Sequence, residues 1–399
     1  MPSSRIALVH DWLTGMRGGE RALEVICERF PKADLFTLVH VRGTVSPVIE
    51  GRRIHTSFIQ HLPLARRHYR HYLPLFPMAV ERFNLTGYDL VLSTSHCAVK
   101  SVIRAPTARH ICYCLTPMRY AWDQFEAYFG AERVGALGSA VMRRVMGRLA
   151  RWDRDTAGRV DRYVAISHYV AGRIARYYNR QATVVYPPVD TVFFHPNGRP
   201  PERFALVVSA LVPYKRVDLA IDACQQAGIP LKIVGEGPER QALEGRASGR
   251  AQFLGQLSDR EVRDLYRRAG VVLLPGEEDF GIVPLEAQAC GRPVVALGRG
   301  GALETVVQGH TGLLVDQPEP AAFADAIAKA VNRSFDSGAI RRHAEQFGRE
   351  RFGDEIEALV REDVPAARPM DAATASDGAS ATPADRRVLR GAGAARDRE

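Results

Sequence analysis

Two glutamates, Glu278 and Glu286, stand in the segment EEDFGIVPLEA, directly after the apolar run VVLLPG. A carboxylate that accepts hydrogen bonds from neighbouring sugar hydroxyls gains about 1.5–3 kcal/mol per bond. Between them, the backbone N–H groups of Phe280, Gly281 and Ile282 are expected at a helix start, where such groups lack partners and can hold phosphate oxygens. On either side of such a phosphate, Glu286 suits a ribose diol and Glu278 suits another hydroxylated group. The alternative is a solvated acidic loop and an acid favoured by the helix dipole.

A fixed positive charge for such a phosphate is available in SALVPYKRVD, where Arg216 follows Lys215. One charge at about 4 Å is worth about 4 kcal/mol at an effective dielectric constant near 20. Two glycine pairs follow predicted strands and can allow a ligand to approach the main chain: Gly18 with Gly19, and Gly235 with Gly237. The first pair would admit a diphosphate and an acceptor, or would only form a tight turn. The second would face a base or a ribose, although it lacks the third glycine of a dinucleotide fingerprint.

The elements that must position these residues are strands alternating with helical patterns, which is typical of parallel α/β folding. Prolines between residues 187 and 196 separate two such series. We therefore predict two Rossmann-like, doubly wound domains, at 1–190 and 191–344, facing each other across a cleft. A helix at about 345–364 is expected to pack back on the first domain, and 365–399 to form a disordered tail. Ligands bind at the carboxyl ends of such strands, so both glutamates should lie near the cleft.

Composition places the chain among ordinary globular proteins, because 46% of its 399 residues are hydrophobic and 25% are charged. The net charge of +9 favours an anionic partner. No segment approaches the roughly 20 apolar residues that span a bilayer, so we expect a cytoplasmic protein, at most peripheral on the inner face of the membrane. Six cysteines without metal-ligand spacing should be reduced and mostly buried, with Cys112 and Cys114 in the core.

A basic and aromatic segment runs from His61 to Phe83 and contains Arg66, Arg67 and Arg70. Basic side chains interleaved with aromatic and aliphatic ones suit the surface of an anionic membrane. The alternative is a helix that solvates one face and packs the other. On the membrane reading, the acceptor is lipid-linked, and Arg119 in PMRYAWD would hold an acceptor phosphate.

Several of these stretches together carry a family resemblance over about residues 5–360. Glu278 and Glu286 resemble the E-x7-E motif of the retaining GT-B glycosyltransferases, in particular family 4 (group 1), and DFGIVPLEAQACGRPVVA is similar to that family's signature. SALVPYKRVD resembles its phosphate-binding turn, with Lys215 in the place of its lysine, and VGEGPE resembles its nucleotide-side loop. HDWLTGMRGGERALE resembles its glycine loop. YCLTPMRYAWD is similar to a stretch of members, many of them mannosyltransferases, that build bacterial polysaccharides and lipid-linked oligosaccharides.

The resemblance implies a GT-B fold and a retaining, metal-independent transfer of a hexose, with mannose from GDP-mannose as the expected donor. The expected acceptor is lipid-linked or a polysaccharide precursor. Lys215, Glu278 and Arg216 are the expected catalytic residues. Ala210 stands where the family often has an arginine, which Arg216 would have to replace, and Leu115 stands where relatives commonly have a histidine.

Metal-dependent nucleotide-sugar enzymes of the other common architecture use an Asp-x-Asp pair, and Asp153 and Asp155 match that pattern. They lie in a basic helical run, where residues two apart point in different directions. We interpret them as helix surface and expect neither a catalytic metal nor another cofactor.

The alternative functions are a UDP-sugar-dependent glycosyltransferase, and an epimerase or a dehydrogenase on similar domains. The incomplete glycine fingerprint argues against the dehydrogenase. A nucleic-acid-binding protein lacks support, because no helix-turn-helix, zinc-finger or RNP-like motif is present.

Overall fold

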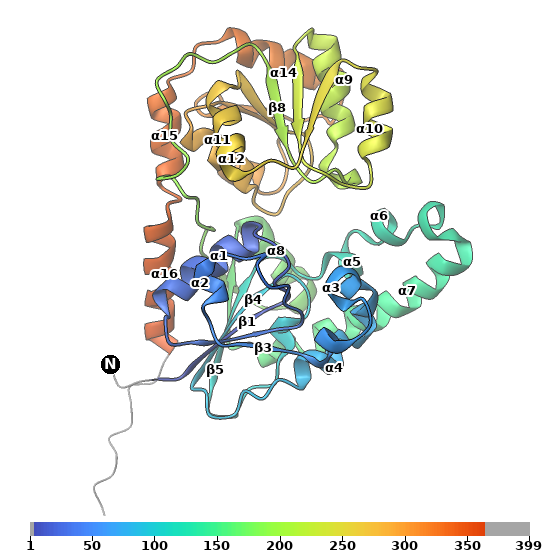
Figure 1. The fold of residues 1–399 in the computed structure, drawn as a ribbon, viewed down its shortest axis with the longest axis vertical. Coiled ribbons are helices and arrows are strands. Elements are labelled where there is room, and N and C mark those ends of the chain that lie inside the picture. Colours follow the sequence, from blue (N-terminus) through green and yellow to red (C-terminus); the bar gives the residue numbers. More distant parts are fainter. Residues whose placement is uncertain (1–3, 364–399) are drawn as a thin grey trace, which may run out of the picture. The chain divides into compact units, whose positions relative to one another are not determined.

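The computed structural model describes residues 4–363. The predicted tail at 365–399 lies outside the described residues. Two all-parallel sheets organise the described chain (Figure 1). We call residues 4–190 the N-lobe and residues 191–345 the C-lobe.

The N-lobe contains a seven-stranded sheet in the order β3-β2-β1-β4-β5-β6-β7. Its strands are β1 Ile6–His10, β2 Asp34–Thr37, β3 Ile54–Thr56, β4 Leu90–Ser95, β5 Arg109–Cys114, β6 Arg162–Ala165 and β7 Ala182–Val184. Its α-helices are α1 Gly18–Arg29, α2 Pro47–Glu50, α3 Ala65–His68, α4 Phe76–Glu81, α5 Arg119–Trp122, α6 Phe125–Phe129, α7 Ala131–Asp155 and α8 His168–Tyr178. Short 3₁₀ turns are η1 Phe58–His61, η2 Tyr69–Leu75, η3 Val99–Ser101 and η4 Ala157–Arg159.

The C-lobe contains a six-stranded sheet in the order β10-β9-β8-β11-β12-β13. Its strands are β8 Ala205–Val208, β9 Leu231–Val234, β10 Ala251–Gly255, β11 Val271–Leu274, β12 Val294–Leu297 and β13 Gly312–Val315. Its helices are α9 Val217–Ala227, α10 Arg240–Ala247, α11 Asp259–Arg268, α12 Ile282–Ala289, α13 Ala302–Thr305, α14 Pro320–Asn332 and α15 Ser337–Glu345, and η5 is Pro213–Lys215.

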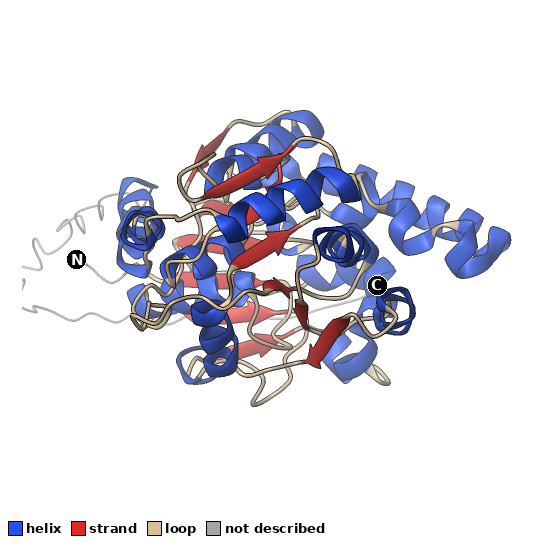
Figure 2. Ribbon diagram, turned by 90° about the horizontal axis from the view of Figure 1, so that it is seen from above, coloured by secondary structure: helices blue, strands red, loops and turns tan. Residues whose placement is uncertain are grey.

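Both sheets are covered by helices on both faces, as Figure 2 shows. Successive side chains of a strand point to opposite faces. In β1, Leu8 joins a core cluster with residues of α1 and α8, whereas Val9 joins another with residues of α4 and α7. In β11, Leu273 packs with α9 and α14, and Val272 with α11 and α12. Burial on both faces explains the continuous apolar runs and confirms the predicted doubly wound α/β class.

The chain passes between the lobes twice, with Val189 and Phe347 joined by a backbone hydrogen bond of 2.9 Å. The second passage leads into α16 (Arg349–Asp363), which packs on α1 of the N-lobe. Arg349 binds two glutamates of α1, Glu24 at 3.0 Å and Glu28 at 2.7 Å. The last described helix therefore ties the chain back to the first lobe.

All six cysteines are buried and unpaired, and Cys112 and Cys114 lie in β5, as predicted. Among residues 4–363, no helix has the length and apolar character needed to cross a bilayer.

Candidate functional site

Loops at the carboxyl ends of the C-lobe strands pack closely on one another. The loop after β9 lies against the loop after β8, and a Cβ atom at Gly235 would overlap the carbonyl oxygen of Ser209. Gly237 has the same relation to Leu211. Gly235 also has a φ of +132°, a conformation that suits glycine. The packing of two loops thus accounts for both glycines, and their predicted contact with a base or ribose stays a prediction.

The loops after β8 and β11 bring the predicted cation and the first predicted carboxylate together. Lys215, at the end of η5, donates from Nζ to Oε1 of Glu278. Both side chains are mostly buried, at 18% and 17% exposed. Arg216 does not join them, because its Nε donates to Asp218 in the first turn of α9, at 3.1 Å. Lys215 alone therefore supplies positive charge at Glu278 from this turn.

The start of α12 presents the predicted backbone donors. Gly281 is its N-cap residue, with a φ of +89° that other residues rarely adopt. Within residues 4–363, the N–H groups of Phe280, Gly281 and Ile282 donate to no other group. Unpaired amides at a helix start, beside Lys215 and Glu278, can hold phosphate oxygens.

Glu286 lies within α12 and is buried, with 8% of its surface exposed. Tyr266 of α11 donates its hydroxyl to Oε2 at 3.0 Å. Burial raises the pKa of Glu286 to about 7, although the charge of Arg21 opposes this shift. Arg21 belongs to α1 of the N-lobe and binds Asp259 of α11 at 2.7 Å. A buried carboxyl group with a pKa near neutrality is typical of functional sites.

On the N-lobe side, Gly18 and Gly19 begin α1 after the first strand. The position of a Cβ at Gly18 is open, whereas a Cβ at Gly19 would lie 2.7 Å from Cδ1 of Leu115. Leu115 therefore lies under this turn, with Cε1 of His10 3.7 Å from the same point. His10 is buried and pairs through Nδ1 with Thr94 at 2.6 Å.

Arg119, the predicted acceptor residue, is bound within the protein. Its Nε donates to Oδ2 of Asp279 at 2.8 Å, and its guanidinium lies 5.4 Å from the ring centroid of Tyr214. Burial opposes its positive charge, but the charge and hydrogen bond of Asp279, together with Tyr214 and Glu278, outweigh this and raise the pKa of Arg119. Contact of Arg119 with an acceptor phosphate stays a prediction. Sequence reasoning missed Asp279, whose only signal was its place directly after Glu278.

The interpretation of Asp153 as helix surface is wrong. Asp153 is fully buried, and its Oδ1 lies 3.0 Å from Nζ of Lys100. Trp122 and Tyr178 each donate to its Oδ2 at 2.8 Å. Asp155, by contrast, is exposed. Among residues 4–363, no group of three or more His, Cys, Asp or Glu side chains is arranged to hold a metal ion.

The segment His61–Phe83 forms short helical pieces, whose aromatic and aliphatic members largely pack inward. Tyr69 and Leu73 are buried, whereas Arg66 and Arg67 are exposed. This arrangement resembles the alternative to membrane binding, in which the segment exposes one face to solvent and packs the other against the protein. Leu64 is nevertheless 70% exposed.

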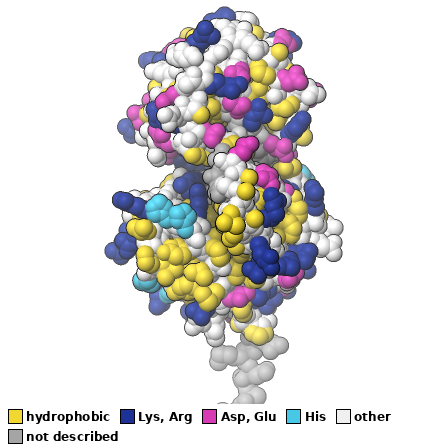
Figure 3. Space-filling view, turned by 90° about the vertical axis from the view of Figure 1, so that its right-hand side faces the viewer, with side chains coloured by type: hydrophobic (Ala, Val, Ile, Leu, Met, Phe, Trp, Pro, Cys, Tyr) yellow, Lys and Arg dark blue, Asp and Glu magenta, His cyan; other side chains and the backbone are white. Residues whose placement is uncertain are grey.

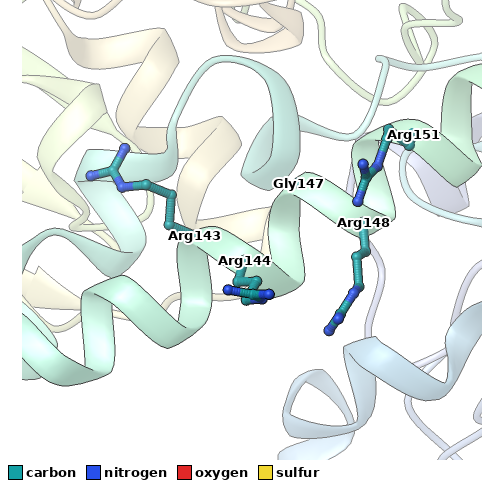
Figure 4. Close-up of a pocket in the computed structure, with 5 residues that line it drawn as sticks. All are labelled: Arg143, Arg144, Gly147, Arg148 and Arg151. Atoms are coloured by element: carbon teal, nitrogen blue, oxygen red, sulfur yellow. The ribbon is translucent and has the colours of Figure 1, made fainter.

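A second basic surface, which the sequence analysis did not use, lies on α7. Arg143, Arg144, Arg148 and Arg151 leave this helix in succession (Figure 4). Arg143 binds Glu126 at 2.8 Å, and the other three have no acidic partner among the described side chains. Exposed apolar residues continue toward the start of the helix, with Leu137 at 80% and Val141 at 55%. Figure 3 shows hydrophobic, histidine and basic side chains together on this side of the N-lobe.

Comparison with known proteins identifies a family for part of the chain. Residues 190–351 match the family described as glycosyl transferases group 1. An uncharacterized glycosyltransferase of Methanocaldococcus jannaschii, MJ1178, is 29% identical over 177 residues, which are 43% of this chain and 50% of that protein. The D-inositol 3-phosphate glycosyltransferase of Mycolicibacterium smegmatis is 31% identical over 236 residues, which are 52% of this chain and 54% of that protein. The chain thus spans about half the length of these relatives.

Solved structures match nearly the whole described chain. HepE of Anabaena, solved in complex with UDP and glucose, has a TM-score of 0.68 at 19% identity and covers 90% of this chain and 100% of its own. Sucrose-phosphate synthase of Thermosynechococcus elongatus has a TM-score of 0.66 at 18% identity, with coverage of 90% and 99%. The chain therefore has the GT-B fold, and its residues 190–351 match the group 1 glycosyl transferases.

Proposed function

We propose that this protein is a hexosyltransferase that takes a sugar from a nucleotide-sugar donor with retention and without a metal ion. The pairing of Lys215 with Glu278, beside the unpaired amides of residues 280–282, carries this proposal. These groups lie at the carboxyl ends of parallel strands, where α/β sheets bind ligands.

The chemistry of sugar transfer matches these groups. When the bond between sugar and diphosphate breaks, negative charge develops on the departing nucleotide, and fixed cations and N–H dipoles stabilise it. Lys215 and the amides of Phe280, Gly281 and Ile282 would bind the diphosphate. Glu278 would then lose its contact with Lys215 and accept hydrogen bonds from hydroxyls of the sugar. Glu286 would accept from the ribose diol.

GDP-mannose is the proposed donor, on the resemblance of YCLTPMRYAWD to stretches found in mannosyltransferases. A UDP-sugar is the second candidate, because HepE was solved with UDP and with UDP-glucose. Leu115, which lies under the α1 turn in place of the family's common histidine, is the residue at which the choice of sugar would be decided.

The proposed acceptor is lipid-linked or a saccharide precursor at an anionic membrane surface. Two surfaces of the N-lobe support this. One has the exposed Arg66 and Arg67, close in sequence to the exposed Leu64, and the other has Arg144, Arg148 and Arg151 of α7, which have no acidic partner among the described side chains. Each basic side chain near an anionic bilayer contributes about 1 kcal/mol of binding. In cosedimentation, the variant Arg144→Gln/Arg148→Gln/Arg151→Gln should therefore bind anionic vesicles more weakly than the wild type does. Vesicles of zwitterionic lipid should not show this difference. Arg199→Gln/Arg250→Gln/Arg260→Gln, which replaces three exposed C-lobe arginines without an acidic partner among the described side chains, is the matched control.

A panel of nucleotide sugars tests the reaction itself. The purified protein is incubated with GDP-mannose, UDP-glucose and related donors in EDTA, and released nucleotide and free sugar are measured by chromatography. Release that Lys215→Ala abolishes, and that Lys329→Ala on the surface of α14 leaves unchanged, supports the proposal. Loss of release in EDTA refutes the metal-free mechanism. An epimerised nucleotide sugar without release favours the epimerase.

A further inference from the structure

Asp279, the residue between Glu278 and the unpaired amides, is held by two arginines of the N-lobe. Its Oδ2 accepts from Nε of Arg119 in α5 at 2.8 Å, and its Oδ1 accepts from Nη1 of Arg173 in α8 at 2.7 Å. Asp279 and Arg173 are each 9% exposed at the side chain, and Arg119 is 19% exposed. These are buried, charge-assisted contacts, in which geometry is strongly fixed.

The partners of Asp279 are themselves held in place within the N-lobe. Nη1 of Arg173 also donates to Oγ1 of Thr116 at 2.6 Å, and its Nη2 donates to Asp123. The main chain of Asp279 is fixed too, because Oγ of Ser167 donates to its carbonyl oxygen at 2.6 Å. The N-lobe thus holds both the carboxylate and the peptide group of this residue.

The start of α8 makes further contacts with the C-lobe. Its first two backbone N–H groups, of His168 and Tyr169, donate to the carboxylate of Glu304 at 2.8 and 3.0 Å. The Tyr169 hydroxyl donates to Oε1 of Glu277 at 2.6 Å. Glu277 and Asp279, the residues before and after Glu278, are therefore both bound to one helix of the other lobe.

We propose that Asp279 is a positioning residue that makes donor binding depend on the N-lobe. This inference rests on the proposed function. Its pairs with Arg119 and Arg173 orient the loop, so that Glu278 faces Lys215 and the amides of residues 280–282 face the diphosphate. Asp279 itself touches no substrate. Without these pairs the loop still carries Glu278 and the amides of residues 280–282, but these groups are no longer held in the orientation that binds the donor.

Asp279→Asn is the first test, because it keeps the size of the side chain and removes its charge. Truncating one partner of a buried charge pair costs enough to weaken binding by about 30-fold or more. We expect the donor KM and the nucleotide dissociation constant to rise by at least that factor, with kcat at saturating donor changed much less. A general loss of structure would lower kcat together with the donor affinity. Asp279→Glu, which keeps the charge, should recover part of the donor affinity.

A double-mutant cycle and a measurement without substrate make the test specific. Arg173→Gln should cost less donor affinity in the Asp279→Asn background than in the wild type, since the contact between the two residues is already lost there. Small-angle scattering of the protein without nucleotide should give a larger radius of gyration for Asp279→Asn than for the wild type. The control is Asp259→Asn, which breaks a different cross-lobe pair, that of Arg21 with Asp259, outside this loop.

The outcomes separate this inference from the proposed function. If the wild type binds and turns over a nucleotide sugar but Asp279→Asn behaves as Asp259→Asn does, the positioning role is overturned. If the wild type binds no nucleotide sugar, the proposed function fails, and scattering still decides whether Asp279 holds the lobes. Equal scattering of both variants and the wild type would then overturn the inference as well.

Discussion

The buried carboxyl group of Glu286 should make the stability of this protein depend on pH, and Glu286→Gln should remove that dependence. Its pKa is raised from 4.5 to about 7 because burial disfavours the ionised form. Below pH 4.5 the folded and unfolded chains both keep the proton. Between pH 4.5 and 7 the unfolded chain releases it while the folded chain keeps it. The free energy of unfolding therefore falls as the pH rises through this window.

The size of the effect follows from the two pKa values. Each tenfold change in an acid dissociation constant corresponds to about 1.4 kcal/mol. Ionising Glu286 in the folded chain therefore costs about 3 kcal/mol relative to the unfolded chain. Between pH 5 and pH 8, the range open to experiment, the loss of stability from this group is about 2–3 kcal/mol.

Denaturant unfolding of the wild type and Glu286→Gln at half-unit steps from pH 5 to 8 measures this difference. The variant should gain stability relative to the wild type as the pH rises, and the gain should level off above pH 7. Glu244→Gln, on the exposed surface of α10, corrects for the removal of a carboxylate that is not buried. The difference in unfolding free energy between the wild type and Glu286→Gln should therefore change with pH. If it stays constant to within about 0.5 kcal/mol, which is the typical effect of a surface substitution, the reasoning is refuted.

Three further changes have expected outcomes. Lys215→Ala should lower the turnover of nucleotide sugar by about 100- to 1000-fold, as the loss of one transition-state contact does, measured by nucleotide release. Lys100→Met leaves the carboxylate of Asp153 buried without its cation and should cost about 3–5 kcal/mol in denaturant unfolding; a cost under about 1 kcal/mol would contradict the buried pair. Gly235→Ala places a Cβ on the carbonyl oxygen of Ser209, so thermal unfolding should begin at a lower temperature, and an unchanged melting temperature would contradict this packing.

The elements and the loops that carry Lys215 and Glu278 were accessible from the sequence because each is specified locally. The run VVLL of β11 is buried on both faces, so its apolar continuity is required by the sheet itself. Gly281 is the N-cap residue of α12 and Pro284 lies in its first turn, as their local preferences indicate. The proximity of Lys215 to Glu278 could be expected as well, since both residues lie in loops that follow the carboxyl ends of neighbouring parallel strands.

Asp153 was misread because a helix surface cannot be assigned from the helix alone. Its spacing from Asp155 correctly indicated different directions, but the basic run around it gave no sign of which direction is inward. Lys100, its partner, comes from η3 and is distant in sequence. A buried ion pair is specified by two segments that meet only in the fold, and neither segment predicts the other.

The same limit applies with more consequence to Asp279. A motif identifies groups that touch a ligand, because one loop presents them at fixed spacing. Asp279 lies inside the motif, yet its partners Arg119 and Arg173 stand 160 and 106 residues away, in the other lobe. Its role depends on how that lobe meets the loop, which no local pattern encodes. Arg119 was predicted to contact an acceptor phosphate, and the structure adds its pairing with Asp279, which the sequence did not indicate. Residues that position a site through another domain must therefore be found from contacts, since their own segment shows only an unexplained charge.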